Sequence, residues 1–265
     1  MASIEIEGGR TINYDVRGDG MPLLLIRGLG GQGADWGSTA GRLASDFQVI
    51  TFDNRDAGSN ESETAGYSIS DLADDAAGLL RSLGIERAHV LGHSMGGFIA
   101  LHLVLNHPDL VDHLILVGTS PAAGAALGQP LVAPTEEEWI SDPVERSRQR
   151  APLTHGPGYF DKRPDELEEI AQLSATNRIT REGYTRHLAA ISDTHDVRDR
   201  LGEINAPTLV AHGDVDPLVS IRGGQMLADG IPGAIFKVYP GVGHFPFREA
   251  ADDFHRDVDA FLRGT

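Results

Sequence analysis

The residues of this chain best suited to chemistry are a serine, an acid and a histidine that each lie beside glycine. Ser94 is the central residue of a G-x-S-x-G pentapeptide, Asp216 ends a G-D-V-D turn, and His244 directly follows a glycine. A serine hydroxyl becomes a nucleophile when a base lies beside it, and a carboxylate can orient that base and stabilise its positive charge. The combination predicts nucleophilic catalysis through a covalent intermediate on Ser94.

The pentapeptide lies where a buried strand is expected to give way to a helix. An apolar, β-prone run at 88–91 precedes it and a helical pattern at 98–105 follows. A sharp turn there would expose Ser94, and its neighbours must then carry almost no side chain, as Gly92 and Gly96 do. The first helix amides would face the oxygen that the serine attacks, which predicts Met95 as one donor of an oxyanion hole. Because the chain contains 32 glycines, the pentapeptide alone could also mark an ordinary tight turn.

A second amide donor is expected in the glycine-rich loop that follows the apolar run at 22–26. A backbone N–H after this third strand would complete the oxyanion hole, and we assign it to Leu29, with Gly30 as the alternative. The same glycines nearly match the dinucleotide fingerprint, and Asp53 lies at about the required distance. That fingerprint should open a helix directly, whereas here the helical pattern begins only around Trp36, so dinucleotide binding is the weaker interpretation.

The acid and the base are expected at the carboxyl ends of other parallel strands, where working residues gather. The strand expected at 112–118 is followed by no carboxylate. The strand at 206–212 is followed by Asp214 and Asp216, and the strand at 234–239 is followed by His244. The chain order serine, acid, histidine is the one expected when the nucleophilic serine lies on a sharp turn between a buried strand and a helix.

These elements belong to a strand-helix alternation that is interrupted once. An antiparallel hairpin at 4–16 is followed by alternating strands and helices up to 118, and the alternation resumes at 206. Between them, prolines, charges and weaker helical patterns (135–150, 165–174 and 181–191) predict a lid of helices. We therefore expect a core at 1–119, a helical cap at 120–204 and the rest of the core at 205–265.

Composition narrows the possible functions. The chain has 265 residues, 40% hydrophobic and 23% charged, and no cysteine, which excludes disulfides, thiol catalysis and thiolate metal sites. The net charge of −17 disfavours nucleic-acid binding. No apolar run reaches membrane-spanning length and no signal peptide is recognised, so we expect a cytoplasmic protein without a membrane partner. No histidine or acid grouping has metal spacing, so no metal and no cofactor are predicted.

The motifs together resemble a capped α/β-hydrolase across nearly the whole chain. The segments that carry the resemblance are Gly28-Leu29-Gly30-Gly31, Asp53-Asn54-Arg55-Asp56-Ala57-Gly58, Gly92-His93-Ser94-Met95-Gly96-Gly97, His212-Gly213-Asp214-Val215-Asp216 and Gly243-His244. The resemblance implies a mostly parallel eight-stranded sheet with helices on both faces and a helical cap inserted after strand 6. It also implies Asp216, at the last position of a G-x-x-D turn, in preference to Asp214. This chain has Arg27 where the family commonly has histidine before the oxyanion loop, so loop orientation or pocket charge is expected to differ.

We therefore expect a serine hydrolase that cleaves a carboxylic ester or lactone of a small, largely apolar molecule. Ser94 excludes the family branches that use a carboxylate nucleophile. A carbon-carbon bond hydrolase or a cofactor-free perhydrolase or haloperoxidase with the same triad remains an alternative, and a non-catalytic ligand receptor is a third. The substrate is expected to be the main partner, with a homo-oligomer possible. An apolar pocket is expected because the cap contains several large apolar residues, and the sequence alone does not select which of them face inward. These residues are Leu127, Leu131, Trp139, Leu153, Tyr159 and Phe160.

Several polar residues have structural interpretations instead. The acids and arginine at 53–59 are expected to pin a loop through Arg-carboxylate pairs. His93 and His212 are expected to pack in the core or on a pocket wall. His155, His187 and His195 are placed in the cap, where contact with substrate is not the expected role.

Overall fold

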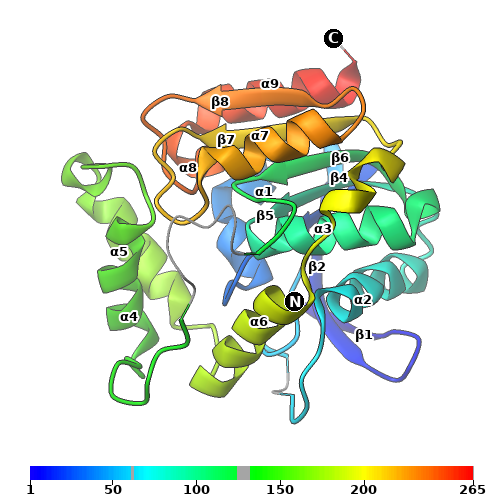
Figure 1. Ribbon diagram of the computed structural model, residues 1–265. Coiled ribbons are helices and arrows are strands. Elements are labelled where there is room, and N and C mark those ends of the chain that lie inside the picture. Colours follow the sequence, from blue (N-terminus) through cyan, green and yellow to red (C-terminus); the bar gives the residue numbers. More distant parts are fainter. Residues whose placement is uncertain (61–62, 124–131, 265) are drawn as a thin grey trace.

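The computed structural model describes residues 1–60, 63–123 and 132–264, so Leu127 and Leu131 lie outside the described residues. Within these residues, eight strands form one sheet in the order β1-β2-β4-β3-β5-β6-β7-β8 (Figure 1). The strands are β1 (Ala2–Glu5), β2 (Thr11–Arg17), β3 (Met21–Ile26), β4 (Phe47–Phe52), β5 (Ala88–His93), β6 (Val111–Val117), β7 (Thr208–Gly213) and β8 (Ile235–Tyr239). Strand β2 is antiparallel to both neighbours and every later pairing is parallel, which confirms the expected fold class.

The central strands are continuous apolar runs because helices cover both faces of the sheet. Residues Leu23 to Ile26 of β3 and every residue of β5 are buried. Strand β3 pairs with β5 in a register that places Ile26 opposite Gly92. The loop after β3 and the turn after β5 therefore leave the sheet side by side.

Two helical layers enclose the sheet. On one face lie α2 (Ile69–Ser82), α3 (Met95–Asn106) and α7 (Ile221–Gly230), and on the other lie α1 (Gly37–Leu43), α8 (Pro246–Glu249) and α9 (Ala251–Arg263). Helix α2 begins where Ser68 caps it, because the serine hydroxyl accepts from the Asp71 amide and the Asp71 carboxylate accepts in return from the Ser68 amide. Short 3-10 turns lie at Gly33–Trp36, Pro108–Leu110, Ala151–Leu153, Phe160–Lys162 and Arg198–Glu203. No helix among the described residues is long and apolar enough to cross a membrane.

Among the described residues, three α-helices lie between β6 and β7 in the chain, and they are here called the cap helices. They are α4 (Pro143–Arg150), α5 (Pro164–Ser174) and α6 (Arg181–Thr194), and α4 and α5 stand beyond the strand ends, at the left in Figure 1. The expected helix at 135–150 is wrong for 135–142, because Asp142 caps a helix whose first residue is Pro143. Helix α6 also packs into the main core through Ala190 and Ile191.

Candidate active site

Ser94 lies on a strained turn between β5 and α3. Its backbone has φ 57° and ψ −123°, outside the regions that side-chain-bearing residues commonly adopt. A Cβ atom on Gly92 would collide with the carbonyl of Gly96, and one on Gly96 would collide with the carbonyl of Ile26. Glycine is therefore required on both sides of Ser94, as the elbow geometry demands.

Asp216 and His244 form a buried pair at the ends of β7 and β8. His244 Nδ1 donates to Asp216 Oδ2 at 2.7 Å, while Asp216 Oδ1 accepts from the amides of Leu218 and Val219 at 2.8 and 3.0 Å. Burial works against the charged form of Asp216, but the charge and hydrogen bond of His244 outweigh it and lower the pKa of Asp216. Asp214 instead accepts from the Gly241 amide at 2.6 Å and is exposed. The structure thus brings Asp216, and not Asp214, against His244.

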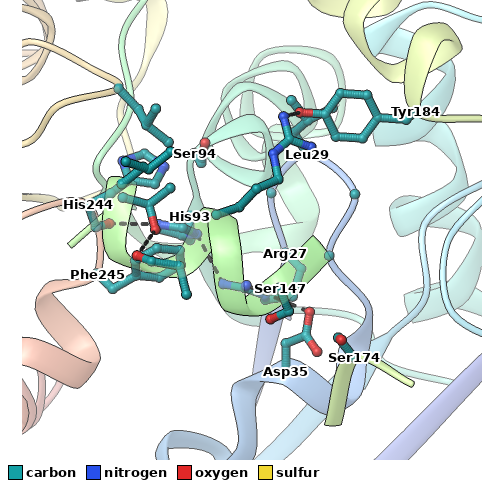
Figure 2. Close-up of a pocket in the computed structure, with 18 of the residues that line it drawn as sticks. Arg27, Leu29, Asp35, His93, Ser94, Ser147, Ser174, Tyr184, His244 and Phe245 are labelled. Carbon is teal, nitrogen blue, oxygen red and sulfur yellow. Dashed lines mark hydrogen bonds and ion pairs between the residues drawn. The ribbon is translucent and has the colours of Figure 1, made fainter. Parts of the chain in front are cut away.

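Ser94 and His244 line the same cavity and lie at one end of it in Figure 2. A Cβ atom on Gly118, at the end of β6, would lie 3.2 Å from His244 Nδ1, and the Ser94 amide donates to Val117 on the same strand end. The hydrogen bonds among the described residues do not include one between Ser94 Oγ and His244. Such bonds commonly tighten only when substrate is bound.

The loop after β3 packs directly on Ser94. A Cβ atom on Gly28 would lie 3.3 Å from Ser94 Oγ, so this loop lies against the serine hydroxyl. The amide of Gly30 donates to His187 Nδ1 at 3.2 Å and is therefore occupied. The Leu29 amide has no hydrogen-bond partner among the described residues, and this favours Leu29 over Gly30 as an oxyanion donor.

His187 on α6 connects the cap helices to this loop. Besides accepting from Gly30, its Nε2 donates to the carbonyl of Arg55 at 2.7 Å. One nitrogen accepts and the other donates, so a single neutral tautomer fits the site. Burial lowers the pKa of His187 and keeps the ring neutral. The sequence patterns placed His187 in the cap and did not predict that it connects the loops that carry Gly30 and Arg55.

Arg27 and His93 hold the loop that carries His244 through a chain of two hydrogen bonds. Arg27 Nη1 lies 3.1 Å from His93 Nδ1, and His93 Nε2 lies 2.8 Å from the carbonyl oxygen of His244. Because a guanidinium can only donate, Nδ1 accepts and Nε2 donates to the His244 carbonyl. Burial, aided by the charges of His244 and Arg27, lowers the pKa of His93 well below its usual value. Figure 2 shows His93 between Arg27 and His244, joined to both.

The loop at 53–59 is pinned by ion pairs, as expected, but the partners lie on helices. Arg55 binds Asp75 of α2 at 2.6 Å, and Asp56 binds Arg186 of α6 at 2.5 Å. Asp53 accepts from the amides of Gly33 and Ser59. No substrate role is needed to explain these charges.

The remaining histidines make structural contacts. His155 donates to the carbonyl of Ala151 and stacks on Phe245, His195 donates to Ser120 and stacks on Phe98, and His212 donates to Val219. Among the described residues, His89, Asp112 and His113 bring three possible metal-ligand atoms within 4.8 Å of one another, at the strand ends opposite the serine. Asp112 is already paired with Arg87 at 3.2 Å.

A cavity of about 600 Å³ joins the strand ends to the cap helices. Residues of all three cap helices line it, together with the loops that carry Ser94 and His244. Of the large apolar residues noted in the cap, Trp139 and Leu153 line this cavity, whereas Tyr159 and Phe160 pack with His155.

Comparison with known proteins places this geometry in a family. The model of the alpha/beta hydrolase fold matches residues 21–251. A protein of Serratia proteamaculans named "Putative carbamate hydrolase RutD" is 30% identical over 258 residues, covering 95% of this chain and 96% of that protein. The crystal structure of an enol-lactonase from Burkholderia xenovorans has a TM-score of 0.84 at 26% identity, covering 99% of this chain and 100% of that one. A hydrolase from Pseudomonas aeruginosa also has a TM-score of 0.84, at 25% identity, covering 98% of this chain and 97% of that one. The chain therefore belongs to the α/β-hydrolase fold family.

Proposed function

We propose that this α/β hydrolase cleaves carboxylic esters or lactones through an acyl-enzyme on Ser94. The observation that carries the proposal is the hydrogen bond between His244 and the buried carboxylate of Asp216, because His244 lines the same cavity as the strained Ser94 turn. The similarity to an enol-lactonase supports a lactone or ester as the reacting bond.

In this mechanism His244 removes the Ser94 proton as the hydroxyl attacks the substrate carbonyl. Asp216 holds the ring with Nε2 free to accept that proton and stabilises the imidazolium that forms. The amides of Leu29 and Met95 bind the developing oxyanion, each lowering the barrier by roughly 3 kcal/mol. His244 then protonates the departing alcohol or ring oxygen, and water repeats the attack to release the acid.

Carbamate cleavage is a second candidate, because the relative from Serratia proteamaculans carries that activity in its name. A carbamate ester presents a carbonyl to the same serine and oxyanion donors, so the residue roles would not change. Parallel assays with p-nitrophenyl butyrate and p-nitrophenyl N-methylcarbamate separate the two: rapid steady turnover of the second alone would favour carbamate hydrolysis.

The direct test compares p-nitrophenyl butyrate and a simple lactone across matched variants. We expect Ser94→Ala and His244→Ala to lose nearly all turnover while circular dichroism shows an unchanged fold. Ser45→Ala is the control and should keep full activity, because Ser45 is exposed, follows the end of α1 and does not line the cavity. Turnover that survives in Ser94→Ala would refute the proposed nucleophile.

A further inference from the structure

The cavity has the opposite charge to the protein as a whole. The chain contains 39 acidic and 22 basic residues, yet the charged side chains that line the cavity are four arginines and one acid. The arginines are Arg27, Arg146, Arg150 and Arg248, and the acid is Asp35. In a chain with a net charge of −17, a cavity lined in this way attracts anions that the outer surface repels.

Arg27 is the most deeply buried of these charges, and its hydrogen-bonding capacity is only partly used. Its side chain is 9% exposed. Within the part of the chain that the structure describes, its nearest carboxylate oxygen, on Asp35, lies 3.8 Å away and its Nε has no hydrogen-bond partner. Burial lowers the pKa of Arg27 to about 10, with Asp35 opposing the shift and Arg248 adding to it. A guanidinium buried in this manner has unused hydrogen-bonding capacity at the cavity wall.

Arg248 lies beside it on α8 and shares an aromatic contact. The guanidinium carbons of Arg27 and Arg248 lie 5.7 and 5.4 Å from the ring centre of Phe245. The nearest acid to Arg248 is Glu166, at 3.9 Å, and burial lowers the pKa of Arg248 as well. Both guanidiniums therefore contact the ring of Phe245, the residue after His244, and neither has a carboxylate of the described residues closer than 3.8 Å.

The arginines of α4 extend the positive surface toward solvent. The guanidinium of Arg146 lies 4.3 Å from the ring centre of Trp139, and that of Arg150 lies 5.0 Å from the ring centre of Tyr184. Neither forms an ion pair with any described residue. Aromatic rings hold both groups in place and leave their charge uncompensated, so an incoming anion meets them before it reaches the buried pair.

We infer that the substrate of the proposed hydrolase carries a carboxylate of its own, and that Arg27 and Arg248 bind it while Ser94 attacks the ester or lactone carbonyl. This inference rests on the proposed function and adds the chemical class of the substrate: the hemi-ester or lactone of a dicarboxylic acid. Each guanidinium is planar and presents N–H donors that fit the two oxygens of a carboxylate, with which it forms charge-assisted hydrogen bonds. The expectation of a small, largely apolar substrate is replaced by that of an amphiphilic one.

The test uses two esters that differ only where a carboxylate replaces a methyl group. Mono-p-nitrophenyl glutarate is the anionic ester and p-nitrophenyl valerate its neutral counterpart. We expect wild-type kcat/KM to favour the glutarate by roughly tenfold or more, and Arg27→Met or Arg248→Met to reduce that ratio by roughly tenfold, the effect of losing one charge-assisted contact. Free glutarate should inhibit valerate hydrolysis by the wild type and not by these variants.

Arg42→Met is the matched control. Arg42 lies on α1, is exposed, pairs with Asp252 at 2.6 Å and does not line the cavity, so the same loss of charge should leave the ratio unchanged. A wild-type ratio of one or less would overturn the inference, as would a ratio that neither cavity variant changes. If Arg27→Met slows both esters equally, Arg27 acts only by positioning His93, and its role in anion binding is refuted.

A result that refutes the proposed hydrolysis can be distinguished from one that refutes the anion site. If the wild type hydrolyses neither ester, the hydrolase proposal fails for these substrates, and calorimetric binding of mono-p-nitrophenyl glutarate to the Ser94→Ala protein then decides the anion site. Binding that Arg27→Met and Arg248→Met abolish would support the site independently of turnover. No binding, or binding unaffected by both changes, would overturn it.

Discussion

The replacement of Asp216 by asparagine tests how the acid acts on His244. Asp216 Oδ1 accepts from two backbone amides and Oδ2 accepts from His244 Nδ1 at 2.7 Å. Asparagine has nearly the same shape but only one acceptor oxygen. If that oxygen keeps the two amide bonds, its NH₂ group faces Nδ1, which must then accept, and the ring proton moves to Nε2. His244 would be held in the tautomer that cannot remove the proton of Ser94.

The expected loss is about 10⁴-fold in kcat, the size found when the catalytic histidine of a serine protease is locked in the wrong tautomer. This factor corresponds to about 5 kcal/mol of transition-state stabilisation. Binding of substrate does not require the tautomer, so KM should change little. The assay is steady-state hydrolysis of mono-p-nitrophenyl glutarate or p-nitrophenyl butyrate, with thermal unfolding to verify the fold.

Asp214→Asn supplies the matched control two residues away. Asp214 is exposed and accepts from the Gly241 amide at 2.6 Å, which an asparagine oxygen can also do. We expect kcat to stay within about threefold of wild type, as for most surface substitutions. An Asp216→Asn enzyme within tenfold of wild type, or a greater loss in Asp214→Asn, would refute the assignment of the acid.

Three further predictions follow from the packing. Gly96→Ala should cost several kcal/mol of unfolding free energy in urea titrations, because its methyl would collide with the carbonyl at the end of β3, whereas Gly41→Ala in α1, with open space around the new methyl, should stabilise by up to about 1 kcal/mol. His187→Phe should lower kcat by roughly tenfold and destabilise by about 2 kcal/mol, because the oxyanion loop and the 53–59 loop each lose a hydrogen bond; unchanged kinetics would exclude a positioning role for the bridge. Burial lowers the pKa of His155 to about 3 and that of His195 to about 4, so both rings bind protons more readily when unfolded. Above pH 6.5 both rings are neutral in the folded and the unfolded protein, and the free energy of unfolding does not depend on them. As pH drops from 6.5 toward 4, each ring should lower the free energy of unfolding by about 1.4 kcal/mol per pH unit. Equal urea midpoints at pH 7.5 and pH 5 would contradict this expectation.

The parts of the fold that could be predicted from sequence are those that depend on local pattern. Continuous apolar runs identified the central strands of the parallel sheet, such as β3 and β5, since strands covered on both faces carry such runs. The turn at Ser94 was recognisable because its glycines are required by contacts within a few residues and with the neighbouring strand. The start of α4 was also present in the sequence, as an Asp142-Pro143 pair, but the helical pattern before it obscured the signal.

The rest depends on contacts between residues far apart in the chain. Residue type and strand position do not distinguish Asp214 from Asp216, and the preference for Asp216 came from the family resemblance alone. In the structure, the path of the loop after β7 turns Asp216 toward His244 and Asp214 toward Gly241. The bridge from His187 to Gly30 spans 157 positions, and no spacing rule relates such residues. The arginines of the cavity likewise come from a loop, a cap helix and α8, so their shared location could be found only in three dimensions.

Labelling of Ser94 by a fluorophosphonate most directly tests the central claim that this serine is an activated nucleophile. After reaction of the wild-type protein, peptide mapping by mass spectrometry should locate a single phosphonyl adduct on Ser94, and ester hydrolysis should fall in proportion to the adduct formed. An enzyme that keeps its activity with Ser94 fully labelled, or that is inactivated by an adduct elsewhere, would contradict the account.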